Sequence, residues 1–237
     1  MKSFGKKILI IIIAFFLLIG IAFGIYVSDY YKPSASALSS LKSDSQITVS
    51  NHDEYYLFKG NQVKGGIIFY PGGKVDERAY APLMKKLAKA NYAVMLAKMP
   101  LHLAMFGLNT ASHIKKENPQ IKHWYLGGHS LGGAMAARYL SKHQGFEGLF
   151  LLASYSTSKL DAHLKCISIY GSQDHVLNRT SYKKYHDNLP KNSQELIIQG
   201  GNHGQFGNYG FQKGDHQSTI TAQQQQNQTV RAIISIL

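Results

Sequence analysis

The sequence predicts an α/β fold with a mostly parallel sheet covered by helices on both faces. Short apolar runs alternate with amphipathic helical segments from Gly66 onward, a pattern typical of parallel strands joined by helical crossovers. The chain has 237 residues, of which 44% are hydrophobic. That length suits one domain of ~100–200 residues together with a short appendage.

The expected elements follow one another in the order that such a sheet requires. An antiparallel hairpin of residues 47–50 and 54–58 is expected at one edge of the sheet. Only a few residues separate Leu152, near the end of one apolar run, from Cys166 at the start of the next, so we expect a minimal lid or none. The remaining expected strands lie at 66–70, 93–97, 123–126, 149–153, 166–170 and 195–199, and the expected helices at 80–91, 110–117, 134–143 and 223–234.

The amino-terminal segment is expected to be a transmembrane helix. Residues 1–7 form a basic end, and residues 8–27 are uncharged and long enough, at ~1.5 Å per residue, to span ~30 Å of hydrocarbon. A cleavable signal usually has a shorter apolar region of ~7–15 residues. We therefore expect an uncleaved anchor, with secretion after cleavage at residues 35–37 as the alternative.

The rest of the chain is expected outside the cell membrane, because lysines before a membrane helix favour the cytoplasmic side. Residues 28–46 are serine-rich and are expected to form a flexible tether, followed by a folded domain at 47–237. The formal net charge is +13, and without the three lysines that precede the anchor it is +10. Such a charge favours anionic partners, here membrane lipids or wall polymers of a bacterial envelope. No motif indicates a nucleic-acid partner.

A glycine-rich turn lies between the expected strand 123–126 and the expected helix 134–143. Its residues Gly128-His129-Ser130-Leu131-Gly132 fit the pattern Gly-x-Ser-x-Gly, in which a serine hydroxyl is exposed on a sharp strand-to-helix turn. Small flanking residues are needed there because the strand and the helix approach each other closely. Ser130 is therefore the candidate nucleophile, and His129 is expected to pack beside it.

A serine hydroxyl needs a base, and the base needs an orienting carboxylate. In sheets of this kind the carboxylate and the histidine follow the serine in that order, each after a strand. Asp174 follows the expected strand 166–170 through a short turn, and His203 follows the expected strand 195–199 in a glycine-rich loop. They are the candidate acid and base. The rivals, which lack a convincing preceding strand, are His216 for the base and Glu147, Asp161, Asp187 and Glu195 for the acid.

Two backbone N–H groups are expected to form an oxyanion hole, where negative charge develops during acyl transfer. One is the N–H of Leu131, directly after the candidate nucleophile. The other is expected after the strand 66–70, in the segment Pro71-Gly72-Gly73-Lys74. Glycines let this backbone turn its N–H groups toward a substrate oxygen, so Gly73 is the first candidate and Lys74 the second.

Six segments carry motifs: Pro71–Asp76, Tyr80–Leu83, Lys98–Leu101, Gly127–Gly133, Tyr170–Asp174 and Gly201–Gly207. Together they resemble the compact bacterial α/β-hydrolase family related to dienelactone hydrolases, from about Ile47 to Leu237. The resemblance implies a triad of Ser130, Asp174 and His203 and hydrolysis of an ester-type bond. Dienelactone hydrolases proper use a cysteine nucleophile, so lactone specificity is not implied. The sole cysteine, Cys166, lies inside an expected strand and excludes an intramolecular disulfide.

The sequence thus predicts a membrane-anchored serine hydrolase that acts outside the cell membrane on a small or polymer-attached ester. Triad chemistry needs no cofactor and no metal ion. Acyl transfer to another alcohol is compatible with the same residues. The alternative from another class is a non-catalytic basic domain on the same fold that binds the cell envelope.

Overall fold

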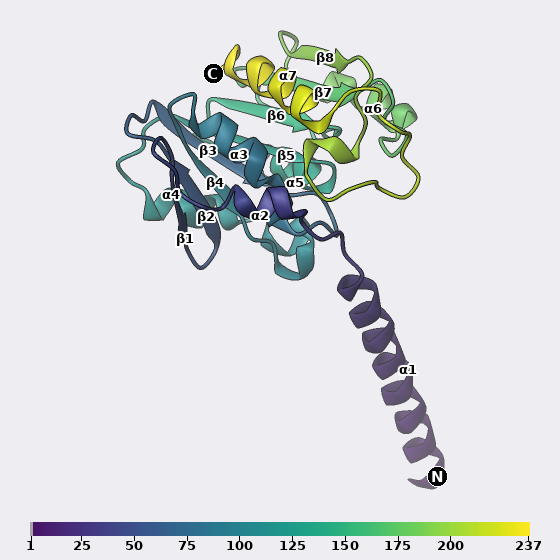
Figure 1. Cartoon of the computed structure of the whole chain (residues 1–237). Helices are drawn as coiled ribbons and strands as arrows, with labels where there is room; N and C mark the ends of the chain where they lie inside the picture. Colours follow the sequence, from purple (N-terminus) through teal and green to yellow (C-terminus); the bar gives the residue numbers. More distant parts are fainter. Residues whose placement is uncertain (1) are drawn as a thin grey trace. The chain divides into compact units, whose positions relative to one another are not determined.

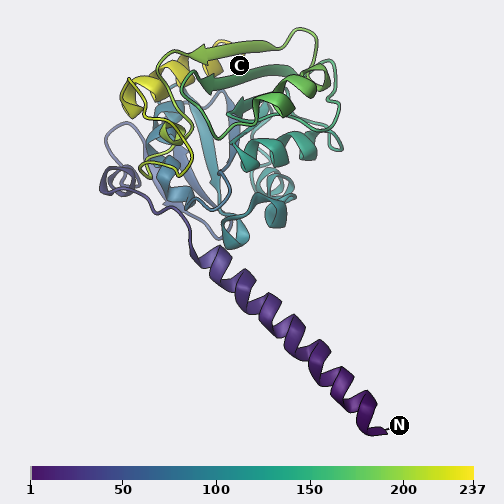
Figure 2. The ribbon, with the colours of Figure 1, turned by 90° about the vertical axis from the view of Figure 1, so that its right-hand side faces the viewer.

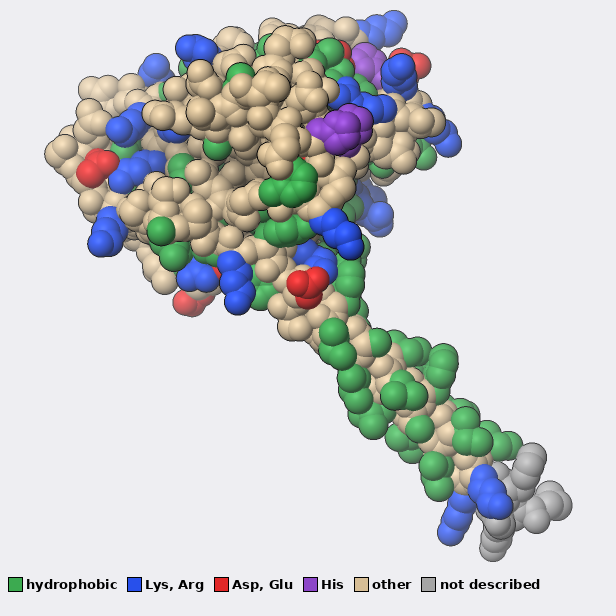
Figure 3. Space-filling view, turned by 45° about the vertical axis from the view of Figure 1, so that its right-hand side comes forward, with side chains coloured by type: hydrophobic (Ala, Val, Ile, Leu, Met, Phe, Trp, Pro, Cys, Tyr) green, Lys and Arg blue, Asp and Glu red, His purple; other side chains and the backbone are tan. Residues whose placement is uncertain are grey.

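The computed structural model describes residues 2–237, so Met1 of the expected basic end lies outside the described residues. The chain divides into two compact units that meet between Tyr30 and Tyr31. The first unit is helix α1 (Lys2–Ser28), and an 18-residue window within its segment Lys6–Ser28 has a mean hydropathy of 3.3. Hydrophobic side chains line this helix (Figure 3). Its length and composition fit a transmembrane anchor.

The second unit, residues 31–237, is called the α/β unit below, and it contains an eight-stranded sheet (Figure 1). The spatial order is β1-β2-β4-β3-β5-β6-β7-β8. Strands β1, β2 and β4 pair antiparallel in that order, and all other neighbours pair parallel. The strands are β1 (Thr48–Asn51), β2 (Tyr55–Lys59), β3 (Gly65–Tyr70), β4 (Tyr92–Ala97), β5 (Trp124–His129), β6 (Gly148–Leu152), β7 (Lys165–Gly171) and β8 (Gln194–Ile198). The predicted α/β fold is therefore confirmed.

Helices cover both faces of the sheet (Figure 2). Because side chains alternate along a strand, Ile67 and Phe69 of β3 pack on one face and Ile68 and Tyr70 on the other. Helices α3 (Ala81–Ala88) and α7 (Ala222–Ile234) cover the first face, and α4 (Thr110–Glu117) and α5 (Leu131–Leu140) cover the second. The shorter helices are α2 (Ala35–Ser39), α6 (Arg179–Lys184), and the 3-10 turns η1 (Glu77–Tyr80), η2 (Pro100–His102), η3 (Ala104–Gly107), η4 (His186–Asn188) and η5 (Gly204–Phe206).

Residues 31–46 belong to the α/β unit and pack on the rest of it, whereas the serine-rich composition indicates a flexible tether over residues 28–46. Ser34 caps α2, and Ala37 in that helix is fully buried. The backbone of Tyr31 bonds to the loop after β3, from its N–H to the Lys74 carbonyl (2.8 Å) and from the Asp76 N–H to its own carbonyl (3.0 Å). Serine composition indicates few apolar contacts, but one buried alanine and a few backbone hydrogen bonds are enough to dock a short segment.

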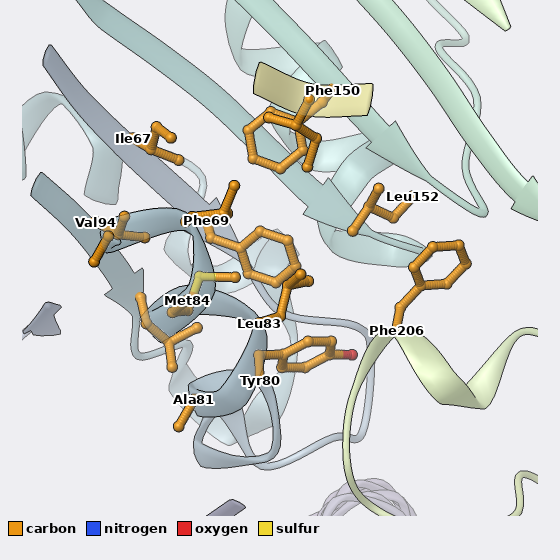
Figure 4. Packing of buried hydrophobic residues seen from close by; sticks show 14 of the residues in the cluster. Ile67, Phe69, Tyr80, Ala81, Leu83, Met84, Val94, Phe150, Leu152 and Phe206 are labelled. Carbon is orange, nitrogen blue, oxygen red and sulfur yellow. The ribbon is translucent and has the colours of Figure 1, made fainter. Parts of the chain in front are cut away.

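The sheet places two loops side by side at its carboxyl edge. The chain runs from β3 to β4 on one side of β3 and later returns to β5 on its other side. At such a switch in strand order the loops after the two central strands diverge and leave a crevice for a ligand. Here they are the segment after Tyr70 and the turn at Ser130. Beneath them, Phe69, Tyr80 and Phe150 pack closely and make the floor rigid (Figure 4).

Candidate active site

Ser130 occupies a strained turn between β5 and α5. Its φ is 51° and its ψ is −122°, a conformation that costs a non-glycine residue ~1–3 kcal/mol and that tends to occur at functional sites. The turn is held by hydrogen bonds from the Ser130 N–H to the Leu152 carbonyl (2.9 Å) and from Ser154 Oγ to the Ser130 carbonyl (2.8 Å). The Ser130 hydroxyl therefore lies at the end of the strand, at the start of the helix.

Gly132 has no room for a side chain. A Cβ atom at this position would lie 2.2 Å from the carbonyl oxygens of Tyr70 and Pro71. Glycine is therefore what allows the first turn of α5 to pack against the end of β3. This packing brings the loop after β3 next to the turn that carries Ser130.

Asp174 and His203 form a buried pair on the loops after β7 and β8. His203 Nδ1 lies 2.9 Å from Asp174 Oδ2, and both side chains are essentially inaccessible to solvent. The other carboxylate oxygen, Oδ1, accepts the N–H groups of Val176 (2.9 Å) and Leu177 (2.8 Å). Those two bonds fix the carboxylate, which in turn fixes the imidazole ring.

His203 Nε2 is buried and has no hydrogen-bond partner among the described residues. No hydrogen bond is formed between Ser130 Oγ and this nitrogen in the described part of the chain. The turn that carries Ser130 nevertheless contacts the base, because the ring of His129, the residue before Ser130, lies 4.5 Å from the His203 ring. Serine–histidine bonds are often loose without substrate and tighten in the complex.

The loop after β3 leaves one N–H group available. In the described residues, the Gly72 N–H donates to Tyr80 Oη (3.1 Å), the Lys74 N–H to the His102 carbonyl (2.8 Å), and the Val75 N–H to the Gly72 carbonyl (3.3 Å). Only the Gly73 N–H in this segment has no such acceptor. A Cβ atom on Gly73 would lie 3.0 Å from Leu131 Cδ2, so the two candidate oxyanion donors are neighbours.

Leu131 is the first residue of α5, so its N–H has no acceptor within the helix. The positive end of the helix dipole lies at the same place. Gly73 and Leu131 therefore both stay candidates for the two oxyanion donors. Lys74, the second candidate from the sequence, has its N–H engaged by His102.

The rival residues are occupied elsewhere. The His216 ring stacks on the His175 ring at 3.3 Å and is exposed. Among the rival carboxylates, Asp161 caps a turn at His163. Two other rivals have partners elsewhere, since Glu147 pairs with His123 and Glu195 accepts from Tyr182. Asp187 lies in η4, before β8.

Sequence reasoning missed the residues that hold the His203 loop. Gln225 of α7 is fully buried, and its amide bonds both to the N–H of Asn202 (3.0 Å) and to its carbonyl (2.8 Å). Asp215 accepts the N–H of Gly204 through Oδ2 (3.0 Å). The available signal was the glutamine run at 223–226, because every third or fourth position of a helix faces inward and a run of four therefore places at least one glutamine there.

No group of three or more His, Cys, Asp or Glu side chains is arranged to hold a metal ion among residues 2–237. Cys166 is buried in the core, where desolvation raises the pKa of its thiol to about 12. Exposed apolar side chains lie near the loop after β3 and in the segment after His203: Leu101, Met105, Phe106 and Phe211. Phe206 and Tyr209, in contrast, are part of the core.

The chain matches the family model described as "Alpha/beta hydrolase family" over residues 66–227. No curated protein sequence matches it. Similar solved structures include carboxyl esterase 2 from the mycorrhizal fungus Tuber melanosporum, with a TM-score of 0.62 and 10% identity over 83% of this chain and 89% of that one.

Two further structures have the same fold. Dienelactone hydrolase from Anabaena variabilis ATCC 29413 has a TM-score of 0.60 and 13% identity, and the match covers 81% of this chain and 99% of that one. Monoacylglycerol lipase from Paleococcus ferrophilus has a TM-score of 0.60 and 13% identity, and the match covers 78% of this chain and 100% of that one. At these identities the likeness is one of fold.

Proposed function

Because this chain belongs to the alpha/beta hydrolase family, we propose that it is a serine hydrolase that cleaves a carboxylic ester through Ser130, His203 and Asp174. The observation that carries the proposal is the buried His203–Asp174 hydrogen bond of 2.9 Å. The other ring nitrogen, His203 Nε2, has no partner among the described residues, and the Ser130 turn is strained. An imidazole oriented in this way is prepared to accept a proton from a nearby hydroxyl.

The proposed reaction has two halves. Ser130 Oγ attacks the ester carbonyl carbon while its proton passes to His203 Nε2, and the N–H groups of Gly73 and Leu131 bind the oxyanion. The carbon–oxygen bond to the alcohol then breaks, and the alcohol oxygen takes the proton from His203. Water attacks the acyl-serine and gives a proton to His203, which returns it to Ser130 Oγ as the acid leaves. Asp174 stabilises the imidazolium in both halves.

Ester chemistry is the proposed substrate class. The names of the structural neighbours include a carboxyl esterase and a monoacylglycerol lipase, which supports an ester over a peptide bond. The exposed Leu101, Met105 and Phe211 side chains favour a substrate with an apolar part. Acyl transfer to a second alcohol would use the same first half-reaction and differs only in the acceptor.

We also propose that α1 remains attached as a membrane anchor, with the α/β unit outside. Cleavage at 35–37 would remove Tyr31, which makes two backbone hydrogen bonds to the loop that carries Gly73. It would also remove the hydrogen bond from the Lys213 N–H to Tyr31 Oη (3.0 Å). The basic surface, with lysines distributed over the face seen in Figure 3, supports anionic lipid or wall polymer as a neighbour. Sequencing the amino terminus of the mature protein tests this, and a start at Leu38 would contradict it.

Labelling with a fluorophosphonate probe tests the catalytic proposal. We expect the purified full-length protein to be labelled, and Ser130→Ala to lose all labelling while keeping its circular dichroism spectrum. Ser235→Ala, an exposed serine at the end of α7, is the matched control and should label like the wild type. Labelling that persists in Ser130→Ala would contradict the assignment. Absence of labelling on folded wild type would favour a non-catalytic envelope-binding domain.

A further inference from the structure

Tyr80 connects the two sides of the candidate site. Its ring lies in the core against Phe69 (5.1 Å), and its hydroxyl oxygen points toward the side where Phe206 lies (Figure 4). The hydroxyl oxygen accepts the Gly72 N–H (3.1 Å) and lies 2.7 Å from His129 Nδ1. A Cβ atom on Gly72 would lie 2.8 Å from both of these side-chain atoms, so the three groups are in close contact.

The hydrogen bonds at Tyr80 determine which nitrogen of His129 carries a proton. In the described residues the Tyr80 hydroxyl has no acceptor other than His129 Nδ1. A buried hydroxyl without an acceptor costs ~1–3 kcal/mol, so we assign the hydroxyl as the donor to Nδ1 and place the proton of neutral His129 on Nε2, which is buried and has no hydrogen-bond partner of its own among the described residues. Protonation of His129 would give Nδ1 its own hydrogen and leave the Tyr80 hydroxyl without an acceptor.

These contacts hold His129 neutral next to the candidate base, His203. Burial lowers the pKa of His129 well below its ordinary value, and the neighbouring His203 lowers it further. The ring lies 4.5 Å from His203 and 5.5 Å from Phe206. A neutral ring at this position supports the His203 imidazole without repelling the positive charge that forms on it during catalysis.

The same hydroxyl also orients the oxyanion loop. Its bond to the Gly72 N–H fixes the peptide before Gly72, and the Val75 N–H bond to the Gly72 carbonyl fixes the peptide after it. In a planar trans peptide the C=O and N–H groups point in opposite directions. The Gly73 N–H therefore points away from Val75, and it stays so only while Gly72 is held.

We propose that Tyr80 and His129 are positioning residues, which link the Gly73 oxyanion donor to the His203 base. The link runs from the Gly72 N–H to the Tyr80 hydroxyl and from there to His129 Nδ1. This role rests on the proposed serine hydrolase function. It predicts that loss of the Tyr80 hydroxyl weakens transition-state stabilisation and leaves substrate binding in place. Removing an oxyanion donor outright slows catalysis by ~10²–10³-fold, so misaligning one should cost about 10-fold or more in kcat.

The test compares Tyr80→Phe with Tyr209→Phe in the full-length protein. Tyr209 is the matched control, because its ring packs on Tyr80 at 6.3 Å and its hydroxyl donates to Gln212. Among the described residues, that hydroxyl forms no hydrogen bond with Gly72 or His129. The readouts are kcat and KM for a p-nitrophenyl ester, and the inhibition constant of phenylboronic acid, which forms a tetrahedral adduct. For Tyr80→Phe we expect kcat to fall about 10-fold or more, KM to stay within twofold, and boronate affinity to fall by a factor like that in kcat. Tyr209→Phe should leave all three within twofold.

A second variant, His129→Phe, keeps a ring against His203 and removes the acceptor of the Tyr80 hydroxyl. We expect it to lower kcat and boronate affinity in the same direction as Tyr80→Phe. Folded Tyr80→Phe protein with unchanged kcat, or with reduced kcat but unchanged boronate affinity, would overturn the positioning role alone. Wild-type protein that no fluorophosphonate labels would overturn the proposed function, and this inference with it.

Discussion

The two sides of the candidate site are held in different ways. On the nucleophile side, Ser130 and Leu131 are placed by backbone geometry within one strand-turn-helix unit, and the space around Gly132 admits no side chain. On the base side, His203 is placed by side chains from distant parts of the chain, namely Asp174, Asp215 and Gln225. The first side depends on sterics and the second on hydrogen bonds.

This difference has consequences for substitution. A steric requirement is local and tolerates only one residue type, so a wrong residue costs folding free energy. A hydrogen-bond requirement is distributed, so a wrong residue can misplace the base while the fold survives. The four predictions below test this contrast, in order of decreasing expected effect.

Asp174→Asn, on the base side, should lower kcat and leave folding stability nearly unchanged. The asparagine oxygen can still accept the Val176 and Leu177 N–H groups, but its NH₂ group would face His203 Nδ1 and impose the wrong tautomer. We expect kcat to fall about 10⁴-fold with little loss of stability. Ester hydrolysis and thermal unfolding measure the two effects. Asp161→Asn, on an exposed turn, is the control, and equal losses in both variants would refute the role of Asp174.

Gly132→Ala, on the nucleophile side, should lower folding stability, in contrast to Asp174→Asn, which should lower kcat with little loss of stability. The new Cβ would lie 2.2 Å from two carbonyl oxygens, so the backbone of β3 or α5 must move. We expect a loss of about 3 kcal/mol or more in the free energy of unfolding. Urea denaturation measures it, with Gly60→Ala as the control because a Cβ there would meet only ordinary contacts, the nearest at 3.5 Å. A stable, fully active Gly132→Ala protein would show that the close approach is not needed.

Gln225→Leu should misplace His203 without removing any proposed catalytic group. It removes the side-chain partners of the buried Asn202 N–H and carbonyl, which should lower the free energy of unfolding by about 1–3 kcal/mol. We expect kcat to fall about 10-fold, since small displacements of a positioned base are costly. Gln223→Leu, an exposed position in the same glutamine run, should change neither quantity. Wild-type kcat in Gln225→Leu would mean that Asp174 alone holds the histidine.

His129 lies where the two sides meet, and it should contribute to the pH dependence of stability. Its pKa is lowered in the folded protein by burial and by His203, so the unfolded chain binds a proton more readily. The associated stability is present above the unfolded pKa of about 6.5 and is lost as the pH falls from there toward the folded pKa. The free energy of unfolding, measured with urea, should therefore fall less steeply between pH 7 and pH 5 in His129→Phe than in the wild type. The two slopes should differ by at most about 1.4 kcal/mol per pH unit. Parallel curves would mean that His129 titrates normally.

The sequence by itself determined the α/β fold and the local features of the site. Alternating apolar runs and helical segments indicated the sheet, and the turn around Ser130 was recognisable because its strand, glycines and helix are contiguous. Asp174 and His203 are predicted as acid and base because each follows a strand, and the carboxyl ends of parallel strands lie at one edge of the sheet. These inferences need only short-range patterns, which a sequence displays directly.

The tertiary structure decided what depends on contacts between distant segments. Within the described part of the chain, it left the Gly73 N–H without an acceptor, whereas the His102 carbonyl accepts that of Lys74. It also brought Gln225 to Asn202 and packed residues 31–46 on the rest of the α/β unit. It also joined Tyr80 to His129, which are separated by 49 positions. The physical reason is that backbone and buried polar groups must find hydrogen-bond partners, and only the folded packing determines which partners are within reach.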